Sequence, residues 1–96
     1  MNKLFDIKYV DLDLNTKEKF ETIRHLAKLA QDRLIDVDKY VEDVKAREAM
    51  STTGIGDGVA IPHAKSAYVK FPTVIVGKSS KGIDWESLDD EPVNLV

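Results

Sequence analysis

The hydrophobic positions of the chain recur with two different periods, which separate strands from helices. Over residues 7–14, apolar side chains alternate with aspartates. This period of two predicts a half-buried strand or extended arm carrying Val10, Leu12 and Leu14. Further along, apolar residues follow at steps of three and four, as on one face of a helix that ends near Arg33. The residues on this face are Phe20, Ile23, Leu26, Ala27, Ala30 and Leu34.

Polar residues mark where two helices are expected to begin. Asn15 is predicted to cap the first helix, because its side-chain oxygen can accept from the backbone N–H of Glu18, which has the acidic position of a capping box. Asp36 is predicted to cap a second, more highly charged helix that reaches Met50. One side of this second helix carries Val37, Tyr40, Val41 and Val44, and further on Glu48 with Ala49.

Three short apolar segments after the helices predict strands. Residues 59–61 form a strand that ends at Pro62, because proline has no backbone N–H to donate to a neighbouring strand. Residues 73–77 are continuously apolar, which is typical of a buried strand. Residues 92–96 have the composition of a strand that is just beginning. Together these segments predict an α/β fold.

The last apolar segment suggests that the domain is incomplete. A domain rarely stops inside an apolar run, because an unpaired hydrophobic edge invites association. Two helices also cannot cover both faces of a sheet that holds four candidate strands. We therefore expect residues 1–96 to be the N-terminal part of a domain whose C-terminal part, with a further helical portion, is missing.

Three other features of the chain have a plain structural interpretation. The acidic residues of segment 84–91 predict a solvated turn. Trp85, the only tryptophan, is expected to be half buried under a loop, and the alternative is a contact with a partner. His25 lies off the apolar face of the first helix and is expected to be solvated.

Composition limits the class of protein. The 96 residues fit one domain, and no apolar run of about 18 residues is present that could enter a membrane. The net charge of −3 makes nucleic acid an unlikely partner. The absence of cysteine removes disulfides, thiolate metal sites and a cysteine nucleophile within this chain. The N-terminus lacks the features of a secretory signal, which predicts a cytoplasmic protein.

The segment from Ser51 to Gly58 is the first candidate for chemistry. Its alternating glycines predict a loop, since neither a helix nor a strand interior favours them. Such a loop offers backbone N–H groups to an anion, and the candidate phosphoryl-binding residues are Thr53, Gly54, Gly56 and Gly58. The loop matches neither a Walker motif nor a dinucleotide fingerprint, so ATP and NAD are disfavoured.

His63 is the candidate nucleophile. It follows a short strand and a rigid proline, and a neutral imidazole nitrogen can attack phosphorus. Arg47, near the end of the second helix, could hold phosphoryl oxygens through its planar guanidinium. The alternative interpretation of His63 is a surface or hydrogen-bonded structural histidine.

The segment from Ser51 to Lys65 resembles the signature of the fructose/mannitol-type EIIA domains (type 2) of the bacterial phosphoenolpyruvate-dependent sugar phosphotransferase system. The resemblance extends to Arg47-Glu48, to Gly82-Ile83-Asp84-Trp85 and to Pro92-Val93. It implies an α/β sandwich with a mixed sheet flanked by helices. It also implies that His63 is the phosphorylated histidine and that Arg47 lies near the phosphoryl group.

The resemblance further implies the partners and the reaction. The phosphoryl group would come from the phosphocarrier protein HPr and pass to a cysteine of EIIB, with fructose as the preferred sugar and no metal or cofactor required. The chain departs from the family by ending before a second active-site histidine, and by having Asp57 where asparagine is common, which adds negative charge near the expected site. The alternatives are a regulatory EIIA, of the nitrogen type or within a transcriptional regulator, and a non-catalytic anion-binding module.

Overall fold

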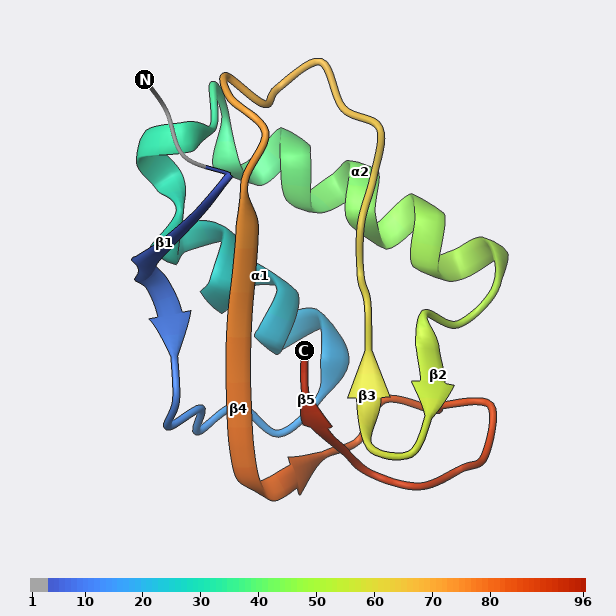
Figure 1. Cartoon of the computed structure of the whole chain (residues 1–96). Helices are drawn as coiled ribbons and strands as arrows, with labels where there is room; N and C mark the ends of the chain where they lie inside the picture. Colours follow the sequence, from blue (N-terminus) through green and yellow to red (C-terminus); the bar gives the residue numbers. More distant parts are fainter. Residues whose placement is uncertain (1–3) are drawn as a thin grey trace.

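Extended and helical segments alternate along residues 4–96, the part of the chain that the computed structural model describes (Figure 1). In chain order the elements are β1 (Phe5–Asp11), α1 (Lys19–Leu29), the 3-10 helix η1 (Gln31–Arg33), α2 (Val37–Met50), β2 (Gly54–Gly56), β3 (Val59–Ala60), β4 (Val74–Ile83) and β5 (Val93–Leu95). The strands form one sheet in the order β1-β4-β5-β3-β2. The pairs β1–β4 and β3–β5 are parallel, and the other neighbours are antiparallel. The predicted α/β fold with a mixed sheet is confirmed.

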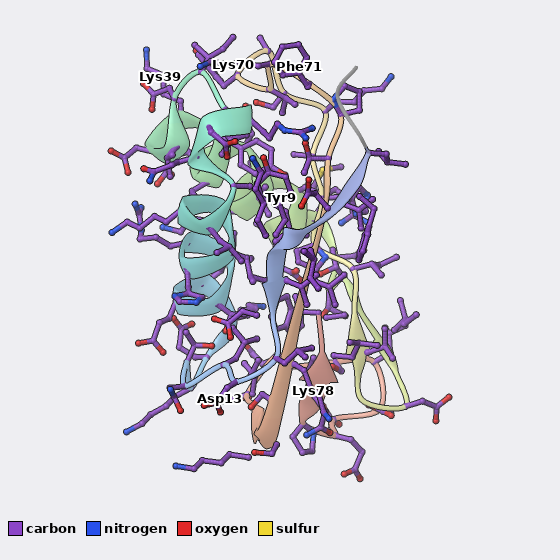
Figure 2. The ribbon with its side chains drawn as sticks, turned by 60° about the vertical axis from the view of Figure 1, so that its left-hand side comes forward. Tyr9, Asp13, Lys39, Lys70, Phe71 and Lys78 are labelled. Atoms are coloured by element: carbon purple, nitrogen blue, oxygen red, sulfur yellow. The ribbon has the colours of Figure 1, made fainter. Side chains whose placement is uncertain are left out.

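Both α-helices lie on the same face of the sheet (Figures 1 and 2). The apolar faces that the spacing predicts meet the sheet there, except for Phe20, which is exposed at the start of α1. Each fully buried aliphatic side chain contributes about 1.5 to 3 kcal/mol to stability. The core consists of Leu14, Ile23, Leu26, Ala27, Leu34, Val41, Val44, Ala60, Ile83, Trp85 and Val93. Among residues 4–96, no helix is both long enough and apolar enough to cross a membrane.

The helix caps agree with the sequence at one helix and differ at the other. Asp36 caps α2 as predicted, by accepting a hydrogen bond from the backbone N–H of Lys39. The predicted cap of α1 is wrong, because Glu18 and not Asn15 takes this position. The Glu18 carboxylate accepts from the backbone N–H groups of Phe20 and Glu21, so the acid itself satisfies two free donors of the first turn.

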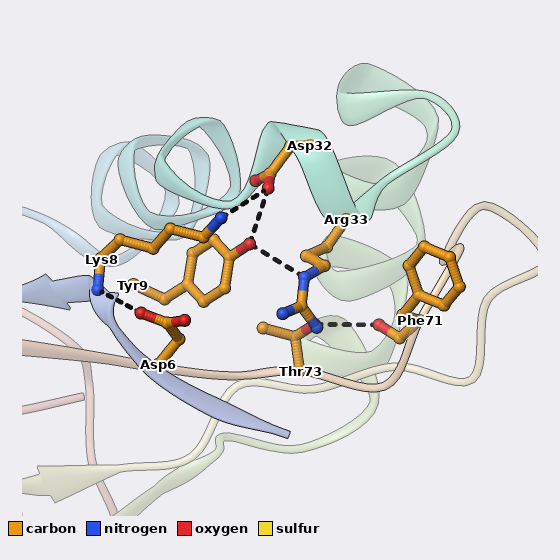
Figure 3. Close-up of polar contacts among 7 residues, drawn as sticks. All are labelled: Asp6, Lys8, Tyr9, Asp32, Arg33, Phe71 and Thr73. Atoms are coloured by element: carbon orange, nitrogen blue, oxygen red, sulfur yellow. Dashed lines mark hydrogen bonds and ion pairs between the residues drawn. The ribbon is translucent and has the colours of Figure 1, made fainter. Parts of the chain in front are cut away.

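The inward-facing side of β1 also differs from the prediction. Tyr9 is fully buried, whereas Leu12 is 68% exposed. The ring of Tyr9 lies beside the buried Arg33, whose Nε donates to the Tyr9 hydroxyl over 2.9 Å (Figure 3). Successive side chains of a strand face opposite sides, so Val10 lies on the face opposite Tyr9 and is half-buried. Leu12 and Leu14 lie beyond β1, and Leu14 is buried in the core as predicted.

β5 does not form an unpaired edge, contrary to the expectation from its sequence. It lies inside the sheet, parallel to β3 on one side and antiparallel to β4 on the other. Val96 exchanges two backbone hydrogen bonds with Gly77, of 2.9 and 3.0 Å. β4 covers ten residues, beyond the 73–77 predicted, and its additional residues Lys78 and Ile83 pair with Leu95 and Val93 of β5.

The glycine-rich segment is a β-hairpin, so the prediction of a loop is wrong. β2 and β3 pair across the two-residue turn Asp57-Gly58, in which both residues have positive φ, 55° and 77°. This conformation matches the twist of a hairpin and favours Asp-Gly. Gly54 also allows close packing, because a Cβ atom there would lie 2.2 Å from Ser87 Oγ.

The segment after β4 combines a buried tryptophan with a solvated turn. Trp85 is fully buried and its indole N–H donates to Thr53 Oγ1 over 3.3 Å, which excludes both half burial and contact with a partner. The acidic residues are exposed, as predicted; they are Asp84, Glu86, Asp89, Asp90 and Glu91. Hydrogen bonds from the backbone N–H groups of Glu91 and Asp57 hold the pKa of Asp89 below its usual value.

Candidate functional site

The structure brings His63 and Arg47 together in one surface hollow of about 470 Å³. His63 comes from the segment after β3, and Arg47 comes from the last turn of α2. The hollow is lined by Asp43, Ala46, Arg47, Met50, His63, Ala64 and Lys65. The two residues that the sequence singles out therefore line the same hollow, although they are sixteen positions apart in the chain.

A short hydrogen bond fixes the ring of His63. His63 is exposed, and its Nδ1 lies 2.7 Å from the carbonyl oxygen of Ile61. A carbonyl only accepts, so Nδ1 must carry the hydrogen and donate it. In the neutral ring the other nitrogen, Nε2, then keeps its lone pair. This geometry leaves Nε2 as the nucleophilic atom.

The charges around the hollow suit an anion. Arg47 and Lys65 each carry a positive charge and Asp43 carries a negative one. The net charge of the lining is therefore +1 when His63 is neutral. Arg47 Nη1 donates to the carbonyl of Ser51 over 3.0 Å, which satisfies a free carbonyl just beyond α2. A guanidinium has five N–H donors, and this bond uses one of them. Within residues 4–96, Arg47 makes no other hydrogen bond or ion pair, so the remaining N–H donors of its guanidinium can bind a ligand.

The four predicted phosphoryl-binding residues of the hairpin lie elsewhere. Thr53, Gly54, Gly56 and Gly58 are not part of the walls of the hollow. The backbone N–H of Thr53 is donated to Glu48, and that of Gly54 to Thr52 Oγ1. These glycines serve the hairpin turn and its packing, and their contact with a phosphoryl group stays a prediction without geometric support.

Asp57 also lies outside the hollow, although its sequence position suggested a charge beside the site. Its place in the hairpin turn explains the residue type, because aspartate tolerates positive φ better than most side chains. The expected repulsion between Asp57 and a phosphoryl group therefore has no basis in this structure.

Sequence reasoning missed three residues that belong to the site or support it. Asp43 and Lys65 line the hollow. Glu48 is buried behind it, where its carboxylate accepts from Thr53. A signal for Glu48 was present in the sequence, because an acid on the apolar side of a helix needs buried donors.

A second hollow of about 700 Å³ adjoins the first, and His63 and Ala64 line both. It lies between the helices and the sheet, with a mostly apolar lining that includes Tyr40 and Val96. Burial raises the pKa of the Tyr40 hydroxyl, because a phenolate is poorly solvated there. His63 thus stands at the border between a charged hollow and an apolar one.

Comparison with protein families gives one match that spans nearly the whole chain. Residues 3–96 match the family "Phosphoenolpyruvate-dependent sugar phosphotransferase system, EIIA 2". The chain is also 42% identical over 89 residues to the fructose-specific EIIABC component of Bacillus subtilis (strain 168). This alignment covers 91% of the chain and 14% of that relative, so the chain spans only a small share of the longer protein.

Solved structures have the same fold. Nitrogen regulatory protein IIA-Ntr from Neisseria meningitidis is similar with a TM-score of 0.87 and 27% identity, over 96% of this chain and 64% of that one. The complex of enzyme IIA mannitol and phosphorylated enzyme IIB mannitol from Escherichia coli is similar with a TM-score of 0.82 and 21% identity. That match covers 97% of this chain and 68% of the other, and it supports the fold alone.

Proposed function

Since the chain belongs to the EIIA 2 family of the phosphoenolpyruvate-dependent sugar phosphotransferase system, we propose that His63 accepts a phosphoryl group and passes it on. The observation that carries this proposal is the hydrogen bond from His63 Nδ1 to the carbonyl of Ile61. It presets the tautomer in which Nε2 is a nucleophile, at a hollow shared with two cations.

The first step is an in-line transfer from a phosphohistidine of the carrier HPr. The Nε2 lone pair of His63 attacks phosphorus, and a new N–P bond forms. The N–P bond to the carrier breaks, and its electron pair returns to the carrier imidazole. No proton needs to leave His63, because Nδ1 keeps its hydrogen and continues to donate it to the Ile61 carbonyl. The phosphorylated ring is then cationic until the next transfer.

Arg47 and Lys65 would stabilise the charge that spreads over the equatorial oxygens during transfer. The planar guanidinium can hold two oxygens at once, whereas the ammonium acts as a point charge. The protein then contributes mainly positioning and electrostatic stabilisation, as is general for phosphoryl transfer.

The second step would transfer the phosphoryl group to a cysteine of EIIB. The thiolate attacks phosphorus, an S–P bond forms, and the N–P bond to His63 breaks so that Nε2 recovers its lone pair. The name of the Bacillus subtilis relative joins A, B and C components in one fructose-specific protein. We therefore propose EIIB as the acceptor, fructose as the sugar and the cytoplasm as the site of action.

A regulatory role is the second candidate, and the similarity to IIA-Ntr supports it. In that case phosphorylation of His63 would change the binding of a partner and would not feed sugar uptake. Transfer from the phosphorylated chain to a purified fructose EIIB distinguishes the two roles, because a regulatory protein would keep its label.

Incubation with labelled phosphoenolpyruvate, enzyme I and HPr tests the proposal. We expect an acid-labile label on the chain that depends on HPr. A chain that stays unlabelled but shifts its NMR signals on addition of inorganic phosphate would instead be a non-catalytic anion-binding module.

A further inference from the structure

Glu48 is a buried carboxylate next to Arg47 in the last turn of α2, and only 3% of it is exposed. A buried carboxylate loses its hydration and destabilises the fold unless donors replace the water. Within residues 4–96, none of the ion pairs involves Glu48. The charge is therefore held by neutral donors.

Thr53 supplies both of these donors. Its backbone N–H donates to Glu48 Oε2 over 2.7 Å, and its hydroxyl donates to Glu48 Oε1. The hydroxyl has one hydrogen, and its oxygen accepts from the indole N–H of Trp85 over 3.3 Å. Glu48, Thr53 and Trp85 are all buried, and their donors and acceptors match.

A chain of hydrogen bonds leads from this cluster to His63. The carbonyl of Thr53 accepts from the backbone N–H of Ile61 over 3.0 Å. The carbonyl of Ile61 accepts from His63 Nδ1 over 2.7 Å. The position of Thr53 thus sets the position of Ile61, and the carbonyl of Ile61 sets the tautomer of His63.

We propose that Glu48 is a positioning residue for His63, acting through Thr53 and Ile61; this inference rests on the proposed function. The carboxylate holds Thr53, the residue just before β2, in place, so that the Ile61 carbonyl stays aligned with the imidazole. When this alignment is lost, either ring nitrogen can carry the hydrogen. A fraction of the molecules then presents a protonated Nε2, which cannot attack phosphorus.

The first test measures the tautomer of His63 in ¹⁵N-labelled protein by long-range ¹H–¹⁵N NMR, in Glu48→Gln and in wild type. The substitution keeps the side-chain volume but places an amide donor against Thr53. We expect a smaller share of the Nδ1–H tautomer and a transfer rate from HPr lower by about tenfold to a hundredfold, as misplaced reacting groups produce. Glu42→Gln is the matched control, because Glu42 is exposed on the same helix and its one ion pair within the described part of the chain is with Lys45, 3.6 Å away.

Thr53 provides a second pair of variants. Thr53→Ser keeps both donors and should retain the wild-type tautomer and transfer rate. Thr53→Val has nearly the same volume but removes the hydroxyl, and it should shift both readouts in the direction of Glu48→Gln. If Glu48→Gln does not fold, the comparison of the two Thr53 variants decides the question.

An unchanged tautomer ratio in folded Glu48→Gln or Thr53→Val overturns the inference, even where the transfer rate falls, because Glu48 would then act through stability alone. A wild-type chain that takes no label from HPr overturns the proposed function instead. The tautomer measurement does not need the label, so the two failures can be told apart.

Discussion

Arg33 and Glu48 are both buried charges at opposite ends of α2, and they connect to different parts of the molecule. Arg33 lies in η1, three residues before α2 is capped at Asp36, and Glu48 lies in its last turn. Each belongs to a network of side-chain hydrogen bonds. The segments that each network connects, and not the buried charge itself, decide whether the residue has a structural role or a role at the site.

The Arg33 network holds the N-terminal strand. Arg33 donates to the Tyr9 hydroxyl over 2.9 Å and to Thr73 Oγ1 over 3.2 Å (Figure 3). The Tyr9 hydroxyl in turn donates to Asp32, and this bond, followed by the contact with Lys8, holds the pKa of Asp32 below its usual value. These contacts join β1, η1 and the start of β4, and none of the residues other than Thr73 lines a hollow that His63 shares.

The Glu48 network leads toward the charged hollow. It passes from the end of α2 to β2 and then to the segment that carries His63. The comparison predicts that changes near Arg33 lower stability and spare phosphoryl transfer, while changes at the other end of α2 act on transfer. The following predictions test this division from the largest effect to the smallest.

The largest effect is expected at His63. His63→Ala should reduce labelling from phosphoenolpyruvate to background, at least about a thousandfold, because among residues 4–96 His63 is the only imidazole that lines the hollow, and the other nitrogen groups there are the cationic side chains of Arg47 and Lys65. Gel-resolved labelling at equal protein concentration measures this. His25→Ala is the control and should label normally, and undiminished labelling of His63→Ala would contradict the proposed function.

The next effect concerns stability. Arg33→Met should lower the free energy of unfolding by about 2 kcal/mol. The hydrogen bonds from a charged donor to Tyr9 and Thr73 are lost, while a long unbranched side chain is kept. Tyr9 still donates to Asp32 in this variant. Denaturant unfolding measures the change, and the labelling rate should stay within about twofold of wild type. A large fall in the labelling rate of the folded variant would show that the two ends of α2 are not independent.

Local patterns in the sequence predicted the helices well and the contacts between distant segments poorly. The spacing of apolar residues predicted α2 and most of α1 because helical periodicity is local. Burial of Tyr9 depends on Arg33, 24 positions away, and burial of Trp85 depends on Thr53, 32 positions away. No pattern within β1 or near Trp85 reveals those partners.

The candidate site shows the same limit. The sequence predicts His63 and Arg47 because their residue types match the chemistry and the segment around them resembles a known signature, and both line the same hollow in the structure. The hairpin differs from the predicted loop although Asp57-Gly58 is a strong turn signal, because alternating glycines are equally typical of a phosphate-binding loop. The proposed role of Glu48 depends on its contacts with Thr53, which form only in the folded chain.

Arg47 should show a moderate effect on transfer. Arg47→Lys keeps the charge but loses the planar fork, so transfer from HPr should slow by about tenfold, which equals about 1.4 kcal/mol in the barrier. Lysine can still donate to the Ser51 carbonyl, and the melting temperature should change little. Rapid-quench kinetics measure the rate. A wild-type rate, or a large loss of stability, would place Arg47 among the structural residues with Arg33.

The smallest effect is expected at Asp11, on the side of the molecule assigned to structure. Its carboxylate lies 2.8 Å from His25 Nε2 and accepts from the backbone N–H of Asp13, and these contacts, the first being the larger, lower the pKa of Asp11. A lowered pKa means that the ionised form stabilises the fold above the unfolded value of about 3.9, and that this contribution is lost as the pH falls through the folded value.

Asp11→Asn should therefore reduce the free energy of unfolding by about 0.5 kcal/mol at pH 6, a size typical of partly exposed pairs, and the difference from wild type should vanish once the pH has fallen below the lowered folded-state pKa of Asp11. Urea unfolding of both proteins across this pH range measures it. Labelling of His63 at neutral pH should not change, because Asp11 joins β1 to α1 and lines neither hollow. A stability difference that persists at the acidic end would mean that Asp11 acts through packing and not through its charge.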